Sequence, residues 1–308
     1  MKTERLFKRF IDDYKLPIQD IEDLDYIDYI VGVIDKKEEW EEFVNRVKER
    51  FGDNVEEYFK YYAEVKESFL NSVKKSPEFM QFNQMDMNKF KIEKPNVSKS
   101  IYTKDNNGKY FLSIDLKQAN FQALKYCGLF KGCDLWQDLI SDFTDFPELI
   151  KSKYLRSVLF GQLNPSRHIT VESYLINNLR PYLSNQGLNN LVMMASDELV
   201  YEIDEELYWK INCIDVVEGI REKFGLYITA DLFKLVRYAL LFKHSERQIE
   251  FFEKRRRRVG AQSTLHCIPN TYYLLAYKLF HNLTIDPRDF LIEHDGVQAR
   301  IIEDVELT

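Results

Sequence analysis

Apolar residues recur at a spacing of three and four positions through the N-terminal part of the chain. One such series covers Phe7–Tyr14, and a longer one covers Val55–Val73. This spacing places apolar side chains on one face of an α-helix, while acids and lysines fill the other faces. The pattern predicts an all-helical N-terminal region over residues 1–95, with a linker or loop at about residues 81–108.

A second pattern starts at the turn signal Asp105-Asn-Asn-Gly108, where a short apolar run opens. The run Tyr110–Leu116 holds a single acid, Asp115, near its end, and helix-forming residues follow at once. Turn residues ahead of an apolar run are typical of a strand that leaves a tight turn. We therefore predict a buried strand that ends at Asp115 and passes directly into a helix.

Two further apolar runs flank Ser196-Asp-Glu198, which predicts a hairpin with acids at its tip. A later helical pattern stops at Gly225, and the stretch Leu226–Val236 begins as a strand. The predicted order, β-α-β-β-α-β, is typical of a split βαβ, ferredoxin-like arrangement in which helices cover one face of an antiparallel sheet. The predicted fold class is α+β, with residues 100–242 as a palm-like core.

The C-terminal part, residues 243–308, is predicted to be mixed. Helical patterns cover about His244–Phe252 and Thr271–Phe280, and a hairpin turns at Asp295-Gly296. Five cations stand between the two helical patterns: Lys254, Arg255, Arg256, Arg257 and Arg258. Such a run either binds phosphate backbones or forms a solvated face.

Composition narrows the class of protein. Hydrophobic residues make up 45% of the chain, which is ample for a core, and the formal charge of −7 argues against a purely electrostatic coat for nucleic acid. The four cysteines include no Cys-x-x-Cys pair, so a reducing compartment is expected. No signal-peptide pattern is visible, and no apolar run approaches the roughly 18 residues of a membrane span. We predict a soluble intracellular protein, cytoplasmic or nuclear, without a membrane partner.

The acids of the two stretches form a candidate metal site. An acid at a strand end and an acid pair on a hairpin of the same sheet can hold two Mg²⁺ or Mn²⁺ ions, and Mg²⁺ prefers carboxylate and phosphate oxygens. Asp115, Asp197 and Glu198 would bind the metals. One ion would help to deprotonate a hydroxyl, and the other would neutralise the leaving pyrophosphate. This chemistry is nucleotidyl transfer from nucleoside triphosphates.

Two motifs carry a resemblance to a known group. Ile114-Asp-Leu-Lys-Gln-Ala-Asn-Phe121 resembles the first palm motif of reverse transcriptases, an acid followed by Leu-Lys-x-Ala and an aromatic residue. Ser196-Asp-Glu198 resembles the third palm motif, in the Asp-Glu form of Y-family and A-family DNA polymerases. The 82 positions that separate Asp115 from Asp197 are similar to the spacing in reverse transcriptases and Y-family enzymes. The resemblance covers about residues 105–240.

The resemblance implies a nucleic-acid polymerase that acts on RNA or DNA, and it implies roles for further residues. The residues implied in nucleotide binding are Lys117, Asn120, Phe121, Arg156 and Arg167. Asn120, five positions after the first acid, or Phe121 would act as a gate against the ribose 2′-hydroxyl. The cations would contact the triphosphate, since arginine is suited to a bidentate grip. Phe160–Arg167 falls where the second palm motif is expected but lacks the usual Pro-Gln-Gly run.

The basic run from Lys254 to Arg258 would hold nucleic acid. Because conventional fingers and thumb are not evident, further protein subunits are expected partners.

Other interpretations stay open. Asp115 can be a helix N-cap, and Asp197 with Glu198 can be an ordinary polar turn. His294-Asp295-Gly296 resembles the His-Asp third motif of A-family polymerases, which makes Asp295 an alternative to Asp197, although Asp-Gly is also a hairpin signal. Diguanylate cyclases share the palm core, so a template-independent nucleotide cyclase is a second candidate function. A third is a non-catalytic nucleic-acid-binding or assembly subunit with a relic palm.

Overall fold

The computed structural model describes residues 3–19, 23–257, 264–294 and 297–308. The N-terminal helices are α1 (Glu4–Tyr14), α2 (Leu24–Val33), α3 (Lys37–Phe51), α4 (Val55–Lys75) and α5 (Pro77–Gln84). The main sheet contains β1 (Tyr110–Leu116), β2 (Leu191–Met194), β3 (Glu198–Ile203), β4 (Ile228–Phe242), β5 (Arg247–Arg256), β6 (Thr264–His266) and β9 (Val305–Leu307).

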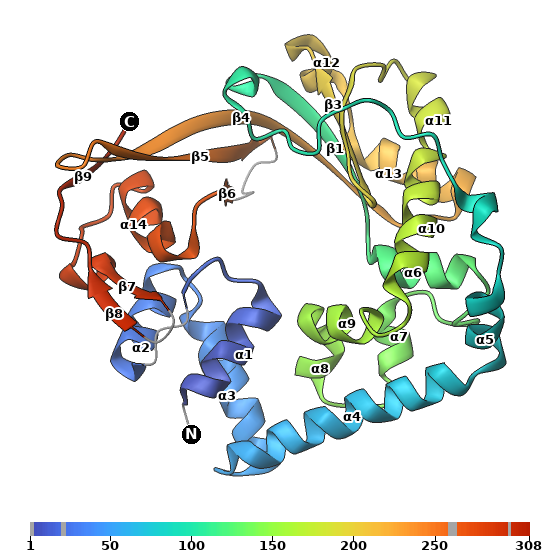
Figure 1. Ribbon diagram of the computed structural model, residues 1–308, viewed down its shortest axis with the longest axis horizontal. Coiled ribbons are helices and arrows are strands. Elements are labelled where there is room, and N and C mark those ends of the chain that lie inside the picture. The colour runs from blue at the N-terminus through green and yellow to red at the C-terminus, as the bar shows by residue number, and fades with distance from the viewer. Residues whose placement is uncertain (1–2, 20–22, 258–263, 295–296) are drawn as a thin grey trace.

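The later helices lie between and after these strands. They are α6 (Ala119–Tyr126), α7 (Trp136–Ile140), α8 (Pro147–Lys151), α9 (Lys153–Phe160), α10 (Pro165–Asn177), α11 (Arg180–Ser184), α12 (Glu205–Lys210), α13 (Cys213–Phe224) and α14 (Asn270–Phe280). Strands β7 (Leu291–His294) and β8 (Val297–Arg300) form a separate hairpin. Figure 1 shows the N-terminal helices on one side of the molecule and the main sheet on the other.

Amphipathic helices build the N-terminal part, as the spacing of its apolar residues predicts. On α3, for example, Trp40 and Phe43 are buried while the intervening acids stay at the surface. The same core also takes in Leu155 and Leu159 of α9 and Leu274 of α14. Segments from three distant parts of the sequence therefore share one hydrophobic core.

The main sheet is antiparallel, with the strand order β2-β3-β1-β4-β5-β6 and β9 added beside β4. Strand β1 is central and pairs with β3 on one side and β4 on the other. The predicted mixture of helices with an antiparallel sheet is confirmed, and so are the helical N-terminal region and the hairpin around Asp197.

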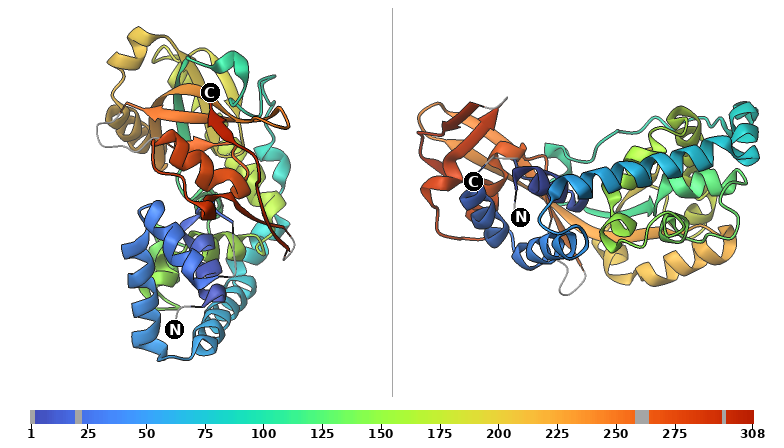
Figure 2. Two further views of the ribbon diagram at one scale, coloured as in Figure 1. Left: turned by 90° about the vertical axis from the view of Figure 1, so that its left-hand side faces the viewer. Right: turned by 90° about the horizontal axis from the view of Figure 1, so that it is seen from below.

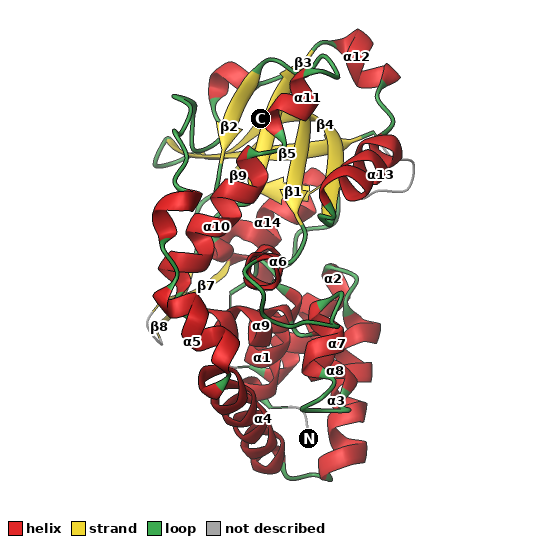
Figure 3. Ribbon diagram, turned by 90° about the vertical axis from the view of Figure 1, so that its right-hand side faces the viewer, coloured by secondary structure: helices red, strands yellow, loops and turns green. Residues whose placement is uncertain are grey.

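The two faces of the sheet differ. Leu112, Ile114 and Leu116 of β1 point to a core that includes residues of α10 and α13, and Figure 3 shows these two helices in front of the strands. Side chains alternate along a strand, so Phe111 and Asp115 point to the opposite face. On that face Phe111 packs in a small cluster with residues of β3, β4 and β5.

The predicted helix over His244–Phe252 is wrong, because residues 247–252 belong to strand β5, which pairs with β4 along its whole length. Ile249 and Phe251 are buried in one cluster and Phe252 in another, so successive side chains point to opposite faces, as in a strand. The predicted strand from Leu226 continues to Phe242 and forms a long hairpin with β5. Turn residues Lys243–Glu246 join the two strands, with Glu246 at φ 53°.

The helical segment over residues 147–160 is not continuous. It is divided into α8 and α9 at Ser152, whose backbone is extended and whose hydroxyl caps α9 by accepting from Leu155 N at 2.8 Å. The predicted helix over Thr271–Phe280 is confirmed as α14. The C-terminal hairpin is confirmed by the pairing of β7 with β8, while Asp295 and Gly296 lie outside the described residues.

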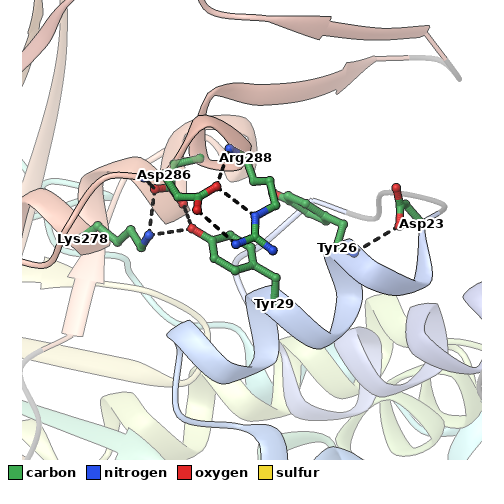
Figure 4. Close-up of polar contacts among 7 residues, drawn as sticks. Asp23, Tyr26, Tyr29, Lys278, Asp286 and Arg288 are labelled. Atoms are coloured by element: carbon green, nitrogen blue, oxygen red, sulfur yellow. Dashed lines mark hydrogen bonds and ion pairs between the residues drawn. The ribbon is translucent and has the colours of Figure 1, made fainter.

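A buried ion pair joins the C-terminal part to the N-terminal helices. Lys278 Nζ of α14 lies 2.8 Å from Asp289 Oδ2 and donates to the Tyr29 hydroxyl of α2 at 2.6 Å. The Tyr29 hydroxyl donates in turn to Asp289 Oδ1 at 2.5 Å, and the Arg288 guanidinium lies 3.7 Å from the centre of the Tyr29 ring. Figure 4 shows Lys278 and Arg288 on either side of Tyr29. In the left view of Figure 2, α14 lies between the sheet and the N-terminal helices.

A second buried polar group lies inside the N-terminal core. Asp13 Oδ1 accepts a hydrogen bond from Ser152 Oγ and lies 3.9 Å from Arg9 Nη1, and only 6% of its side chain is exposed. Burial raises the pKa of Asp13 to about 6, although the Ser152 hydrogen bond and Arg9 act in the opposite direction. The ionised carboxylate is therefore a net cost to the folded state at neutral pH.

Asp13→Asn is expected to stabilise the protein above pH 6. The folded state binds a proton more tightly than the unfolded chain, so wild-type stability falls as pH rises from about 4 to 6 and the cost persists above that range. The variant removes a cost of about 2–3 kcal/mol at pH 7.5 and almost none at pH 4. Urea unfolding at pH 7.5 and at pH 4 measures the difference in free energy of unfolding between variant and wild type, with Asp12→Asn as the control. An equal effect at both pH values would contradict this assignment.

Among the residues that the structure describes, no helix has the length and apolar character needed to cross a membrane.

Candidate functional site

Asp115 lies at the end of the central strand of the sheet. In the strand register it stands opposite Glu198 of β3 on one side and Thr229 of β4 on the other. Directly opposite residues of antiparallel strands project from the same face, so Asp115 and Glu198 are neighbours on the face opposite α10 and α13. Thr229 Oγ1 donates to Asp115 Oδ2 at 3.5 Å. Two acids that are distant in the sequence are thus brought side by side.

Backbone and amide contacts fix the end of β1. Leu116 N donates to the carbonyl of Asp197 at 2.8 Å, which holds the β2–β3 turn against the strand. The buried side chain of Gln122, on α6, accepts from Tyr227 N at 2.8 Å and donates to the carbonyls of Tyr227 and Lys117. The chain after β1 is therefore tied to the start of β4, and Asp115 has a rigid backbone support.

A row of polar side chains continues from Glu198 across the same face. Ser113 Oγ donates to Glu198 Oε1 at 2.5 Å. Asp231 stands opposite Ser113 on β4, and its Oδ2 accepts from Arg256 Nε of β5 at 2.6 Å. Ser113, Asp231 and Thr229 carry no local sequence signal, and only the register of β4 against β1 brings them together.

Helix α9 supplies positive charge to the acids. The pKa of Asp115 is raised to about 6, first by burial and then by the negative charges of Asp197 and Glu198, while Lys153 lowers it. Arg156, one turn further along α9, has its pKa lowered by burial and raised in part by Asp115. Its buried Nε has no hydrogen-bond partner in the described part of the chain. Lys153 was missed by the sequence analysis, although its spacing of three from Arg156 on a helix was readable.

The acids do not form a complete metal site in this arrangement. Within residues 3–19, 23–257, 264–294 and 297–308, no group of three or more His, Cys, Asp or Glu side chains lies close enough to hold a metal ion. The hydrogen bond from Ser113 engages one oxygen, Oε1, of the Glu198 carboxylate. In chemical type the donors suit Mg²⁺, which prefers carboxylate oxygens.

The residues suggested for nucleotide binding are divided between the site and other places. Lys117 is exposed immediately after β1. Asn120 is half-buried, and its Oδ1 accepts from Phe121 N at 2.9 Å. Phe121 is fully buried and stacks on Phe130 with ring centroids 5.7 Å apart, so its ring does not face a substrate in this structure.

Arg167 lies elsewhere, against the end of α5. Its guanidinium donates to the carbonyls of Phe82 and Met85, the last of which belongs to the C-cap of that helix. Both carbonyls lie at the C-terminal end of the helix, where a guanidinium is a suitable donor, and that of Phe82 also accepts from Met85 N at 3.3 Å. The structure therefore gives Arg167 a structural contact and does not bring it to Asp115.

The basic run is divided by the alternation of strand β5. Lys254 and Arg256 project from the face that carries the acids, whereas Arg255 projects from the opposite face and pairs with Glu253 at 2.8 Å. Arg257 donates to the carbonyls of Tyr208 and Ile211 at the end of α12. Arg258 and the alternative acid Asp295 lie outside the described residues.

Comparisons of the chain with protein-family models, with curated proteins and with solved structures returned no match.

Proposed function

We propose that this protein is a metal-dependent nucleotidyltransferase with a palm-like core, and that it extends nucleic acid from nucleoside triphosphates. The observation that carries the proposal is the register of β1 and β3, which pairs Asp115 with Glu198 at the end of the central strand. The strand order β2-β3-β1-β4, with helices on one face, agrees with the ferredoxin-like palm arrangement expected from the sequence.

The charges around the acids support a triphosphate substrate. Asp115, Asp197 and Glu198 would hold Mg²⁺ or Mn²⁺, which neutralises phosphate oxygens and activates an attacking hydroxyl when it is bound. Lys153 and Arg156 of α9 both interact electrostatically with Asp115. Arginine is suited to a bidentate grip on phosphate oxygens, and the side chain of Arg156 is half-buried. Together these groups would orient the triphosphate against the acids.

Nucleotide incorporation with Mg²⁺ or Mn²⁺ tests the proposal. Labelled NTPs and dNTPs are supplied with and without a primed template, and the products are separated by length. Elongated primer supports the polymerase and identifies its sugar preference. A short cyclic product without template would support the cyclase alternative instead, and absence of any product under all conditions would contradict the proposal.

Arg156→Gln is expected to raise the KM for the nucleotide about tenfold or more, because it removes a charge-assisted hydrogen bond to phosphate. Arg167→Gln makes the same change of charge at the end of α5 and is expected to leave KM unchanged. Steady-state kinetics on both variants, with thermal unfolding to verify folding, measures the difference. An equal rise of KM in the two variants would show that Arg156 has no special contact with the substrate.

One observation favours a second candidate, a non-catalytic nucleic-acid-binding or assembly subunit. Within the described ranges the acids are not gathered in the geometry of a metal site, and Ser113 holds Glu198. Such a subunit would bind nucleic acid equally well with or without Mg²⁺ and would incorporate no nucleotide. Mn²⁺ binding to the wild type but not to Asp115→Asn would argue against this second candidate.

A further inference from the structure

The face of the sheet that carries the acids also carries a pair of stacked rings. Tyr102, from the segment before β1, stacks on His266 of β6 with ring centroids 5.0 Å apart and planes 20° apart. His266 stands opposite Phe252 in the strand register, and the Tyr102 ring lies 5.8 Å from that of Phe252. Both members of the pair are half-buried, so the sheet supports them and solvent still reaches them.

A cation stands beside the stacked pair. Lys254 Nζ lies 5.8 Å from the centre of the Tyr102 ring and 4.7 Å from that of Phe233. Its neighbours in β5 pair with acids, Arg255 with Glu253 and Arg256 with Asp231. In the part of the chain that the structure describes, no carboxylate pairs with Lys254. Its charge is therefore available to a ligand.

The stacked rings are uncharged at neutral pH. Burial lowers the pKa of His266 to about 4, and the charges of Lys254 and Arg256 lower it in the same direction. The result is a neutral aromatic surface with an ammonium group at its side. Nucleic-acid bases stack on aromatic side chains without regard to sequence, and cations beside the rings bind the phosphates.

The stacked rings and Lys254 lie on the same face of the sheet as the acids, further along strand β4. Asp115 stands opposite Thr229, and Lys254 stands opposite Leu235, six residues further along β4. At about 3.3 Å per residue, the backbone positions of Thr229 and Leu235 are separated by roughly 20 Å along the strand. A stacked strand with a rise of about 3.4 Å per nucleotide covers that distance in about six nucleotides. Glu198 stands opposite Asp115 on the side away from β4. Burial, and after it the charge of Glu198, raises the pKa of Tyr102.

We infer that Tyr102, His266 and Lys254 bind single-stranded nucleic acid about six nucleotides behind the 3′ end that is extended at Asp115. The inference rests on the proposed function for the identity of this strand. The binding surface itself rests on the stacked rings and the lysine. Bases stack on Tyr102 and His266, and Lys254 binds the phosphate between them.

Fluorescence anisotropy with labelled single-stranded 12-mers, in EDTA, tests this surface without any need for catalysis. Lys254→Gln, Tyr102→Leu and His266→Ala are each expected to weaken binding about fivefold, the lower range of a lost stacking or phosphate contact. Leu at position 102 keeps the packing on Phe252, and thermal unfolding verifies that each variant is folded. Parallel titrations with DNA and RNA oligomers show which sugar the surface prefers.

Lys234→Gln is the matched control for charge. Lys234 lies on the neighbouring strand, opposite Arg255, and its Nζ stands 5.0 Å from the Tyr110 ring on the other face of the sheet. The inference is overturned if Lys254→Gln and Lys234→Gln weaken binding equally, or if Tyr102→Leu and His266→Ala both stay within twofold of wild type. A wild type that binds these oligomers through this surface but incorporates no nucleotide would refute the proposed function and leave the surface intact.

Discussion

Replacing Asp115 by Asn is expected to reduce metal-dependent nucleotide incorporation about a thousandfold or more. The substitution keeps the shape of the side chain and removes the negative charge that lies opposite Glu198 on the central strands. Loss of one preorganised group at a site of developing charge lowers the rate of the chemical step by about two to three orders of magnitude. Loss of a metal ligand is expected to lower this rate at least as much. Single-turnover incorporation with saturating nucleotide measures the effect.

The controls for this variant separate chemistry from stability. Glu202→Gln removes a carboxylate from the same strand as Glu198, where it pairs with Lys109 at 3.0 Å, and it is expected to leave incorporation within about twofold. Asp115→Asn itself should not weaken the fold, because burial raises the pKa of Asp115 to about 6 and the ionised form is disfavoured there. Incorporation that survives in Asp115→Asn would place the chemistry elsewhere in the molecule.

Asp289→Asn is expected to destabilise the protein by about 3–5 kcal/mol. The Asp289 side chain is fully buried, and the variant leaves the Lys278 ammonium, 6% exposed, without an opposite charge. Removing one partner of a buried pair is costly because the remaining charge stays desolvated. Equilibrium unfolding in urea at pH 7 measures the loss.

A second substitution distinguishes the lost ion pair from simple disruption of packing. Lys278→Met in the Asp289→Asn background removes the unpaired charge and keeps the apolar length of the side chain. The double variant is expected to recover at least half of the lost stability, since replacing both members of a buried pair is often close to neutral. A double variant less stable than Asp289→Asn would mean that the charge of Lys278 is not the source of the cost.

The sequence predicted those parts of the fold that depend on local pattern. The strand that ends at Asp115 and the hairpin around Asp197 were predictable because turn residues and short apolar runs mark their limits. Strand β5 was not, because its two acids, Glu250 and Glu253, are three positions apart, a spacing that also fits one face of a helix. Its pairing with β4 makes this segment a strand, and that pairing is a tertiary contact that the local sequence does not show.

Of the residues in the candidate site, only the acids were predictable from the sequence. Ser113 and Asp231 join it through strand register, and Lys153 joins it through the packing of α9, which no local pattern reveals. Two neighbouring positions, Asn120 and Phe121, could each have faced a substrate. The structure turns Phe121 into the core against Phe130, because α6 packs that side of the helix inward.

The bond between Lys278 and Tyr29 joins residues 249 positions apart. A ribosome therefore releases the N-terminal helices long before α14 exists to cover them, and their core lacks Leu274 during that interval. Contacts of such long sequence separation form late, since the intervening chain must be ordered first. The apolar surface that Leu274 later covers is therefore open during synthesis, and chains that end before residue 278 are expected to aggregate rather than to accumulate as a folded N-terminal fragment.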